Sequence, residues 1–562
     1  MKVCSPVHAR VRSFAAASAL AALALTGCAT AQTAVAQSPQ GPQSLRTAAE
    51  ESGFKRHTRH PELLEYLRAL RAASPEMRLG YYGETFQGRE LPYAVFSRPA
   101  VTQPFEAWAS GKPVLVLAAN VHGNERTLRE SLLLLLRDLA TPGTEVNGWL
   151  DDLVIVVVPT INPDGFEASE RGIRGNSWGI DMNRDYVKLE QQSVTNYIRN
   201  VLHRWRPHLF VDGHNGGAYP YNLSYQCASN ASADPSLTQV CDEEIFPLID
   251  RRMLENGYES WYYARGTRTR WNTGGWQARI GRNYGGLVNS VAILFESPGS
   301  QPLETGVMAG VVGYKTVLEY VRDNAEKLMA LVQDARQTTA AFGDGAWDEV
   351  VVRQDYAPEP YKVTYKIAEG EGKNRRVIEV QSDSLMKRPV PVLKRPRPWA
   401  YVLPRDAVAA VDLLRRHGIT VEVLVDSTRL EVDAYTLADV SYERAYNHQA
   451  ATVVEVGEVV TIERTLPQGT FIVPTDQALG RLAAYMLEPE TDDNVIYWNT
   501  MDAWLPKAEL AAQRTARAQN ADGSTPVGET GPDVSVRADA EPPLIPIFKL
   551  MDRVPLPARL LD

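Results

Sequence analysis

Four short apolar segments constrain the fold of this chain more than any other feature of its sequence. They cover residues 113–119, 153–158, 209–212 and 291–295 and consist mainly of Val, Ile, Leu, Phe and Ala. Apolar runs of this length are typical of strands that are buried on both faces of a parallel sheet. Helical patterns at 125–140, 187–205 and 307–335 alternate with them. The alternation predicts an α/β fold with a mixed, mainly parallel sheet flanked by helices, in which ligands bind beyond the carboxyl ends of the strands.

The C-terminal part of the chain has a different pattern. Strand-like and helical segments follow one another at residues 350–352, 361–367, 377–380, 407–417, 452–464, 470–473 and 477–487. They predict a smaller α+β domain over residues 345–562, after a first domain over residues 56–338. Residues 513–543 are rich in Ala, Gly, Asp, Thr and Pro without periodicity, which predicts a disordered loop. No catalytic motif is recognisable in this second domain.

The first residues have the composition of an export signal. Lys2, Arg10 and Arg12 precede a run of Ala and Leu over residues 14–25, which is too short to span a bilayer. The sequence Leu25-Thr-Gly-Cys28 that follows resembles the lipobox of bacterial lipoproteins, in which the Cys is lipidated. We therefore expect a signal peptide over residues 1–27 and a tether over residues 28–55. The protein would be exported to the bacterial cell envelope and anchored by lipid at Cys28, facing the periplasm. Cleavage after residues 34–36 would instead release it as a secreted protein.

Charge and cysteine content narrow the function classes. The chain has 59 Lys and Arg against 68 Asp and Glu, a net charge of −9, and phosphate contacts require a surplus of basic residues. We therefore expect no nucleic-acid partner. Cys227 and Cys241 lie 14 positions apart. In an oxidising compartment they form either a disulfide or two buried free thiols, and the sequence does not decide between them.

Potential metal ligands follow two of the predicted strands. His122 and Glu125 come directly after the first strand, and His214 comes directly after the third. Strand ends of a parallel sheet meet at one edge, so the three side chains can converge. Two His and one Glu form a known ligand set for catalytic zinc, which leaves one position for water. Asp212 is a candidate acceptor for the outer ring N–H of a ligand His.

Further motifs occur in a fixed order around these residues. They are Asn162-Pro-Asp-Gly165, the segment Arg174-Gly-Asn-Ser-Trp-Gly-Ile-Asp-Met-Asn183-Arg184, and Phe295-Glu296-Ser297. Together with the His and Glu positions they resemble the zinc metallocarboxypeptidase family over residues 56–335. The resemblance implies one Zn²⁺ per chain on His122, Glu125 and His214. It also implies peptide substrates with a free C-terminal carboxylate.

The same resemblance assigns roles to four other residues. It implies Glu296 as the general base and acid, Arg174 as the group that polarises the scissile carbonyl, and Asn183 with Arg184 as the site for the terminal carboxylate. The chemistry agrees, because a carboxylate can take a proton from water and pass it to the leaving nitrogen. An arginine fork also binds a carboxylate through two parallel hydrogen bonds.

One family feature is missing. Well-studied members carry a mobile Tyr near a Ser-Gly-Gly before the catalytic Glu, whereas this chain has Trp271-Asn-Thr-Gly-Gly275. Tyr284 is the candidate replacement as the group that covers the substrate.

Two clusters of large side chains precede Glu296. Aromatic residues at 258, 261, 262 and 263 are expected to pack in the core. The arginines at 265, 268, 270, 279 and 282 either face acidic groups of a substrate or, the favoured alternative, form a solvated, salt-bridged surface.

Three functions remain open from the sequence. The favoured one is a zinc metallocarboxypeptidase that hydrolyses C-terminal peptide bonds through a zinc-activated water and a glutamate base. The second is a zinc amidohydrolase or deacylase that acts on N-acyl amino acids. The third is a non-catalytic envelope protein that binds peptide ends. The oligomeric state is not predicted.

Overall fold

The computed structural model describes residues 41–266, 268–343, 347–370, 375–445, 447–506 and 543–561. The predicted signal peptide, Cys28 and almost all of the predicted loop at 513–543 lie outside these ranges. No helix within them is long and apolar enough to cross a bilayer.

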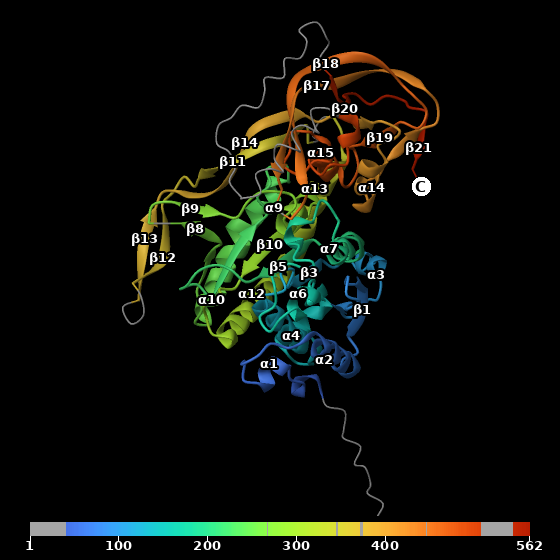
Figure 1. The fold of residues 1–562 in the computed structure, drawn as a ribbon. Coiled ribbons are helices and arrows are strands. Elements are labelled where there is room, and N and C mark those ends of the chain that lie inside the picture. The colour runs from blue at the N-terminus through green and yellow to red at the C-terminus, as the bar shows by residue number, and fades with distance from the viewer. Residues whose placement is uncertain are drawn as a thin grey trace, which may run out of the picture. The chain divides into compact units, whose positions relative to one another are not determined.

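An eight-stranded mixed sheet organises the N-terminal region. Its strand order is β1-β2-β4-β3-β5-β10-β6-β7. The four predicted strands are β3 (Val114–Ala119), β4 (Val154–Val158), β5 (Leu209–His214) and β10 (Val291–Glu296); they lie side by side in parallel, and all their residues are buried. Figure 1 shows β3, β5 and β10 together at the centre of this region. The predicted mixed, mainly parallel sheet is confirmed.

Four further strands complete the sheet. They are β1 (Met77–Glu84), β2 (Glu90–Phe96), β6 (Leu223–Cys227) and β7 (Ser260–Tyr262). β1, β2 and β6 run antiparallel to their neighbours toward the centre, which makes the sheet mixed. A disulfide joins Cys227, at the end of β6, to Cys241, so the structure contains the bridge rather than two free thiols.

The helices of this region differ from the predicted ones in two places. The long segment predicted at 307–335 is two helices, α12 (Leu303–Asp323) and α13 (Ala325–Ala340), because Asn324 leaves the helical conformation with φ −124°. The segment at 187–205 becomes helical only at Gln192, through α7 (Gln192–Tyr197), a π-helical turn and α8 (His203–Trp205). The remaining helices are α2 (His60–Ala73), α3 (Pro104–Ala109), α4 (Thr127–Ala140), α5 (Glu145–Gly148), α6 (Pro163–Glu167), α9 (Pro235–Val240), α10 (Phe246–Glu255) and α11 (Gly281–Leu287).

The predicted tether is too long at its C-terminal end. A 3-10 turn at Pro42–Ser44 and helix α1 (Ala48–Glu51) pack on the sheet-bearing region, and Ala49 is fully buried. Glu50 of α1 forms an ion pair of 2.6 Å with Arg137 of α4. Residues from Gly41 onward therefore belong to the folded unit.

The C-terminal residues build two further sheets and a hairpin. β11 (Glu349–Pro358) and β14 (Leu385–Pro396) join β8 (Ala264–Gly266) and β9 (Trp271–Thr273) in one sheet, and β12 (Val363–Glu369) pairs with β13 (Arg376–Ser382). The other sheet has the order β18-β17-β20-β15-β19-β16-β21. Its strands are β15 (Ala400–Leu403), β16 (Glu422–Leu424), β17 (Thr428–Arg444), β18 (Ala450–Leu466), β19 (Phe471–Pro474), β20 (Leu544–Leu550) and β21 (Ala558–Leu560). Helices α14 (Val408–Arg416) and α15 (Gly480–Leu487) accompany it.

This strand-rich part shares a sheet and a hydrophobic core with the first part. β14 pairs with β9, which precedes strand β10 in the chain. One hydrophobic core also includes Phe210 of β5 together with Leu414 and Leu482 of the C-terminal helices. The two regions therefore fold as one compact unit over residues 41–562.

Candidate metal centre and catalytic pocket

The three predicted metal ligands meet at the carboxyl edge of the sheet. His122 and Glu125 follow β3, and His214 ends β5, the parallel neighbour of β3. Oε2 of Glu125 lies 2.9 Å from Nδ1 of His122 and 2.8 Å from Nδ1 of His214, and the two Nδ1 atoms are 3.1 Å apart. All three residues are buried.

Asn120 shapes the loop that carries the first two ligands. Its φ of +63° lies in the left-handed region, which Asn tolerates better than most residues. Its side-chain amide donates to the carbonyl oxygens of His122 and Glu125, at 2.8 and 2.9 Å. The chain therefore turns sharply after β3 and returns both ligands to one point.

Each ligand histidine has a carboxylate behind it. Nε2 of His122 lies 2.9 Å from Oδ1 of Asp181, and Nε2 of His214 lies 3.0 Å from Oδ2 of Asp212. A carboxylate at Nε2 favours a proton there and leaves the Nδ1 lone pair for a metal. Asp212 therefore lies within ion-pair distance of His214, as predicted, although no hydrogen bond of its carboxylate oxygens is found among the described residues. The sequence did not single out Asp181, although it lies inside the Arg174–Arg184 motif.

This donor set fits zinc. Two imidazole nitrogens and one carboxylate are common ligands of catalytic zinc sites. Two neutral Nδ1 atoms only 3.1 Å apart would direct their lone pairs at each other, and a cation between them removes that repulsion. His122, Glu125 and His214 are thus the residues that would hold the ion.

Glu296 ends β10 beside His214, with which it is in register. It is 7% exposed, and desolvation of its carboxylate raises its pKa to about 7, with a further increase from Glu125 and an opposing effect of His214. A bound divalent cation would lower this pKa. Gly216 leaves the space that this carboxylate occupies, since a Cβ there would lie 2.4 Å from Oε2 of Glu296.

Arg174 lies next to the ligands. Its guanidinium forms ion pairs with Oε1 of Glu125 at 3.1 Å and Oδ2 of Asp181 at 3.0 Å. Asn162 holds the arginine's loop, because its amide donates to the carbonyl oxygens of Val121 and Gly175. The Asn-Pro-Asp-Gly motif therefore joins two loops of the site rather than contributing a catalytic group.

Asn183 and Arg184 line the same cavity of about 450 Å³ as Arg174, Glu296 and the three ligands. Oδ1 of Asn183 accepts a hydrogen bond from the backbone N–H of Gly281 at 2.9 Å. Nη1 of Arg184 donates to the carbonyl oxygen of Asn183 at 2.8 Å. The structure thus brings together the predicted catalytic, metal and carboxylate-binding residues except one.

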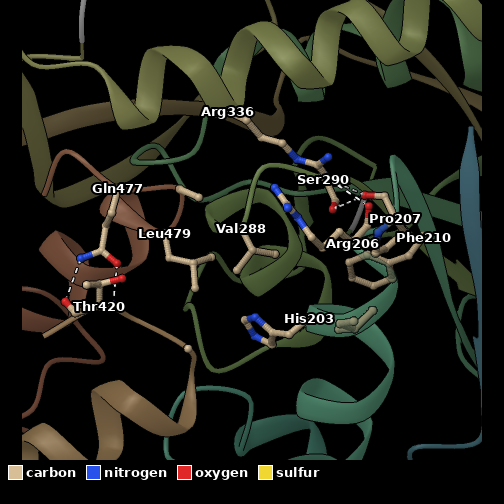
Figure 2. A pocket seen from close by; sticks show the side chains of 13 residues that line it. His203, Arg206, Pro207, Phe210, Val288, Ser290, Arg336, Thr420, Gln477 and Leu479 are labelled. Carbon is tan, nitrogen blue, oxygen red and sulfur yellow. Dashed lines mark hydrogen bonds between the residues drawn. The ribbon is translucent and has the colours of Figure 1, made fainter. Parts of the chain in front are cut away.

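Tyr284 is that exception, and its predicted role is wrong. It is fully buried in α11, and its hydroxyl lies 2.7 Å from Nε2 of His203 and 2.9 Å from Nδ1 of His417. His203 borders a second cavity of about 290 Å³ with Val288 and Leu479, which Figure 2 shows. None of the predicted site residues lines that second cavity.

Tyr263 is the tyrosine that lines the catalytic cavity. Its neighbour Tyr262 packs in the core against Phe246, with ring centroids 5.5 Å apart. Tyr263 lies just after β7, between that strand and β8, so it is not part of the strand whose residues pack in the core. The sequence analysis expected all four aromatic residues to pack in the core and so did not identify Tyr263 as a cavity residue.

The arginine cluster separates into different environments. Arg268 is exposed and pairs with Glu369, as the favoured alternative predicts. Arg279 also forms an ion pair, with Asp493, but only 12% of its side chain is exposed, so it does not belong to a solvated surface. Arg265 and Arg282 instead line the catalytic cavity. Arg282 is 3% exposed, so for this residue the expected solvated surface is wrong.

The chain is similar to known carboxypeptidases. Residues 63–284 match the family model described as zinc carboxypeptidase. Carboxypeptidase 2 of Trichophyton tonsurans is 27% identical over 73% of this chain and 77% of its own length, and the Trichophyton rubrum protein is 27% identical over 78% and 83%. A solved metallo-carboxypeptidase from Burkholderia cenocepacia is 18% identical over 47% of this chain and 69% of its own, with a TM-score of 0.38.

The sequence match and the order of the site residues lead to the same conclusion. The chain contains a zinc carboxypeptidase domain, and its class is that of a metallocarboxypeptidase hydrolase.

Proposed function

We propose that this protein removes C-terminal residues from peptides, with one zinc ion per chain and Glu296 as the base. The observation that supports this most strongly is the position of Glu296 at the end of β10, in register with the ligand His214. A buried carboxylate and a triad of zinc-type ligands thus share one edge of the sheet. The family is zinc-dependent, which agrees with this ligand set.

Zinc bound at His122, Glu125 and His214 would supply an activated water and polarise the scissile carbonyl. Glu296 accepts a proton from the attacking water and then delivers it to the leaving nitrogen. Its position suits both roles, because Glu296 lines the same cavity as the three ligand residues and a carboxylate can both accept and donate a proton. Arg174, which is 43% exposed at the cavity, stabilises the negative charge that develops on the carbonyl oxygen.

Substrate binding relies on the charged groups farther along the cavity. Arg184 offers a planar fork for the terminal carboxylate, and Asn183 contributes neutral hydrogen bonding. This arrangement would select a free C-terminus and reject internal peptide bonds. Tyr263 takes the place that Tyr284 was expected to have, because it lies on the cavity wall.

The test joins metal analysis to peptide digests read by mass spectrometry, for the wild type and Glu296→Gln. We expect one zinc per chain in both proteins and stepwise loss of C-terminal residues with the wild type. Loss of a general base lowers the rate by about 10²–10⁴-fold. Full activity of Glu296→Gln would refute the base assignment. Stoichiometric zinc without hydrolysis of any peptide or N-acyl amino acid would favour the binding protein.

The same digest separates the peptidase from a deacylase. A peptidase prefers a substrate with several residues before the scissile bond, whereas a deacylase hydrolyses N-acyl amino acids as well as or better than peptides. Faster turnover of N-acyl amino acids than of matched peptides would replace the first proposal by the second.

We also propose that the protein is exported and anchored in the bacterial cell envelope by lipid at Cys28. The basic start, the short apolar run and Leu25-Thr-Gly-Cys28 support this. Cys28→Ser should move the protein from the membrane fraction to the soluble fraction. Unchanged membrane retention of that variant would contradict the anchor.

A further inference from the structure

Within the part of the chain that the structure describes, Arg282 is a buried charge without a carboxylate partner. Nη2 of its guanidinium donates to the carbonyl oxygen of Gly275 at 2.6 Å. Among the described residues it forms no ion pair with a carboxylate, and its Nε is buried without any hydrogen-bond partner. Burying an arginine in this way is costly unless a ligand completes its surroundings.

The guanidinium lies at the wall of the catalytic cavity. Arg282 lines this cavity together with Arg184, Asn272 and Gly274. The cavity's two carboxylates have other roles: Glu125 contacts both ligand histidines and Arg174, and Glu296 is the proposed base. A Cβ at Gly274 would lie 2.9 Å from Nη2 of Arg282, so the glycine there makes room for the guanidinium.

We propose that Arg282 binds the side-chain carboxylate of the substrate's last residue, so that the preferred substrates are peptides that end in Glu or Asp. The inference rests on the proposed function, in which Arg184 and Asn183 hold the α-carboxylate of that same residue. Two carboxylates of one residue then meet two separate arginines. The buried cation acquires its counter-ion only when such a substrate is bound.

Neutral substrates should be rejected for a physical reason. A site built around a hydrogen-bonding or charged group discriminates strongly against an analogue that lacks it, because its buried polar groups stay unpaired. Glutamine is the sharpest comparison, since it matches glutamate in shape and lacks only the charge. We expect the wild type to hydrolyse a Glu-terminated peptide with a kcat/KM at least about 100-fold above that of the Gln-terminated peptide.

The experiment uses the zinc-loaded protein and four peptides that differ only in a C-terminal Glu, Gln, Leu or Lys. Arg282→Met keeps a long side chain and removes the charge. It should lower kcat/KM for the Glu peptide by about 100-fold and change that for the Gln and Leu peptides by less than about 3-fold. Arg268→Met is the matched control, because Arg268 is exposed, pairs with Glu369 and does not line the cavity. It should behave as wild type.

The possible results are distinct. Equal hydrolysis of Glu and Gln peptides by the wild type would overturn the inference and leave the peptidase intact. An equal loss for all four peptides in Arg282→Met would also overturn it, since Arg282 would then act on Glu296 and not on the substrate side chain. No hydrolysis of any peptide by the wild type would refute the proposed function itself.

Two measurements do not depend on a stable Arg282→Met variant. The wild-type ratio of Glu to Gln hydrolysis is one of them. Calorimetric titration of the wild type with free L-glutamate and with L-glutamine is the other, and it requires no turnover. Tighter binding of glutamate supports the inference, and equal binding contradicts it.

Discussion

Two histidine pairs in this protein have opposite electrostatic surroundings. His122 and His214 form the metal site, whereas His203 and His417 lie on either side of the Tyr284 hydroxyl. Burial by itself acts to lower the pKa of an imidazole, and this effect is present at all four histidines. At the metal site, however, nearby carboxylates outweigh burial, so the pKa values of His122 and His214 are raised.

No carboxylate of the described residues acts on the pKa of the second pair. Burial lowers the pKa of His203 to about 4 and that of His417 to about 3. Nε2 of His417 faces the carbonyl oxygen of Val187 at 2.8 Å, a neutral partner. Surroundings that favour a proton on an imidazole also favour a metal cation beside it. Neighbouring carboxylates, rather than burial or the number of histidines, therefore distinguish a metal site from a structural cluster.

The largest difference in zinc binding and activity is expected between two single variants, each of which removes one histidine from one of the two pairs. We expect His214→Ala to lose zinc binding and peptide hydrolysis together, because it removes a ligand; the loss of zinc affinity should exceed the 10–100-fold typical of an outer partner. His417→Ala should keep one zinc per chain and wild-type kcat/KM, while its unfolding free energy falls. Metal analysis measures the zinc content, kinetics measures kcat/KM, and denaturant unfolding measures the unfolding free energy. Stoichiometric zinc in His214→Ala would contradict the ligand assignment.

The next effect tests the carboxylates behind the ligands. Asp212→Asn keeps the shape of the side chain and removes its charge next to Nε2 of His214. Zinc affinity should fall by about 10–100-fold in a competition titration against a chelator. Asp250→Asn is a control, since Asp250 accepts hydrogen bonds from Tyr225 and Ser260 away from the site. Equal zinc affinity of Asp212→Asn and wild type would mean that the carboxylate does not tune the ligand.

Acid should destabilise the protein through the second pair. The folded pKa of His417 lies below its unfolded value, so the unfolded state takes up a proton first. The stability that this group contributes is complete above about pH 6.5 and is lost as the pH falls from about 6.5 toward about 3. At pH 5 this amounts to about 2 kcal/mol for His417. Zinc-loaded protein should be used, because His122 and His214 have raised pKa values and titrate in the opposite direction without metal.

Denaturant unfolding at pH 7.5 and pH 5 measures this difference. His417→Gln, which cannot titrate, should lose less unfolding free energy between the two pH values than the wild type does. The same pH dependence in both proteins would show that His417 is not the group responsible.

Much of the fold was predictable because its central strands are buried on both faces. β3, β4, β5 and β10 are continuous apolar runs, and their ends carry His122, Glu125, His214 and Glu296. β1, at the edge of the sheet, has only Met77 and Tyr82 buried, so it lacks that pattern. The core shared with the C-terminal region depends on contacts between residues far apart in the sequence, and periodicity does not report those.

Contacts between distant residues also explain why the predictions for Tyr284 and Arg282 were wrong. Tyr284 was chosen for its closeness to Glu296 along the chain, but α11 directs it toward His203 and His417. Arg282 lies only two positions away in the same helix and lines the catalytic cavity. Residues two apart on a helix point in different directions, so spacing along the chain could not decide which of them meets the substrate.

The smallest expected effect separates the two tyrosines. Tyr284→Phe removes the hydroxyl between His203 and His417, and leaving buried polar atoms unpaired should lower the unfolding free energy by about 1–3 kcal/mol. Its kcat/KM should stay within about 2-fold of wild type, because the ring remains in the core. Tyr263→Phe should show the reverse: an unfolding free energy within about 0.5 kcal/mol of wild type, and a kcat/KM reduced about 2–10-fold by the loss of one hydrogen bond to the substrate. If Tyr284→Phe lost activity without losing stability, the hydroxyl would have to reach the substrate, and the contrast between the two histidine pairs would fail at Tyr284.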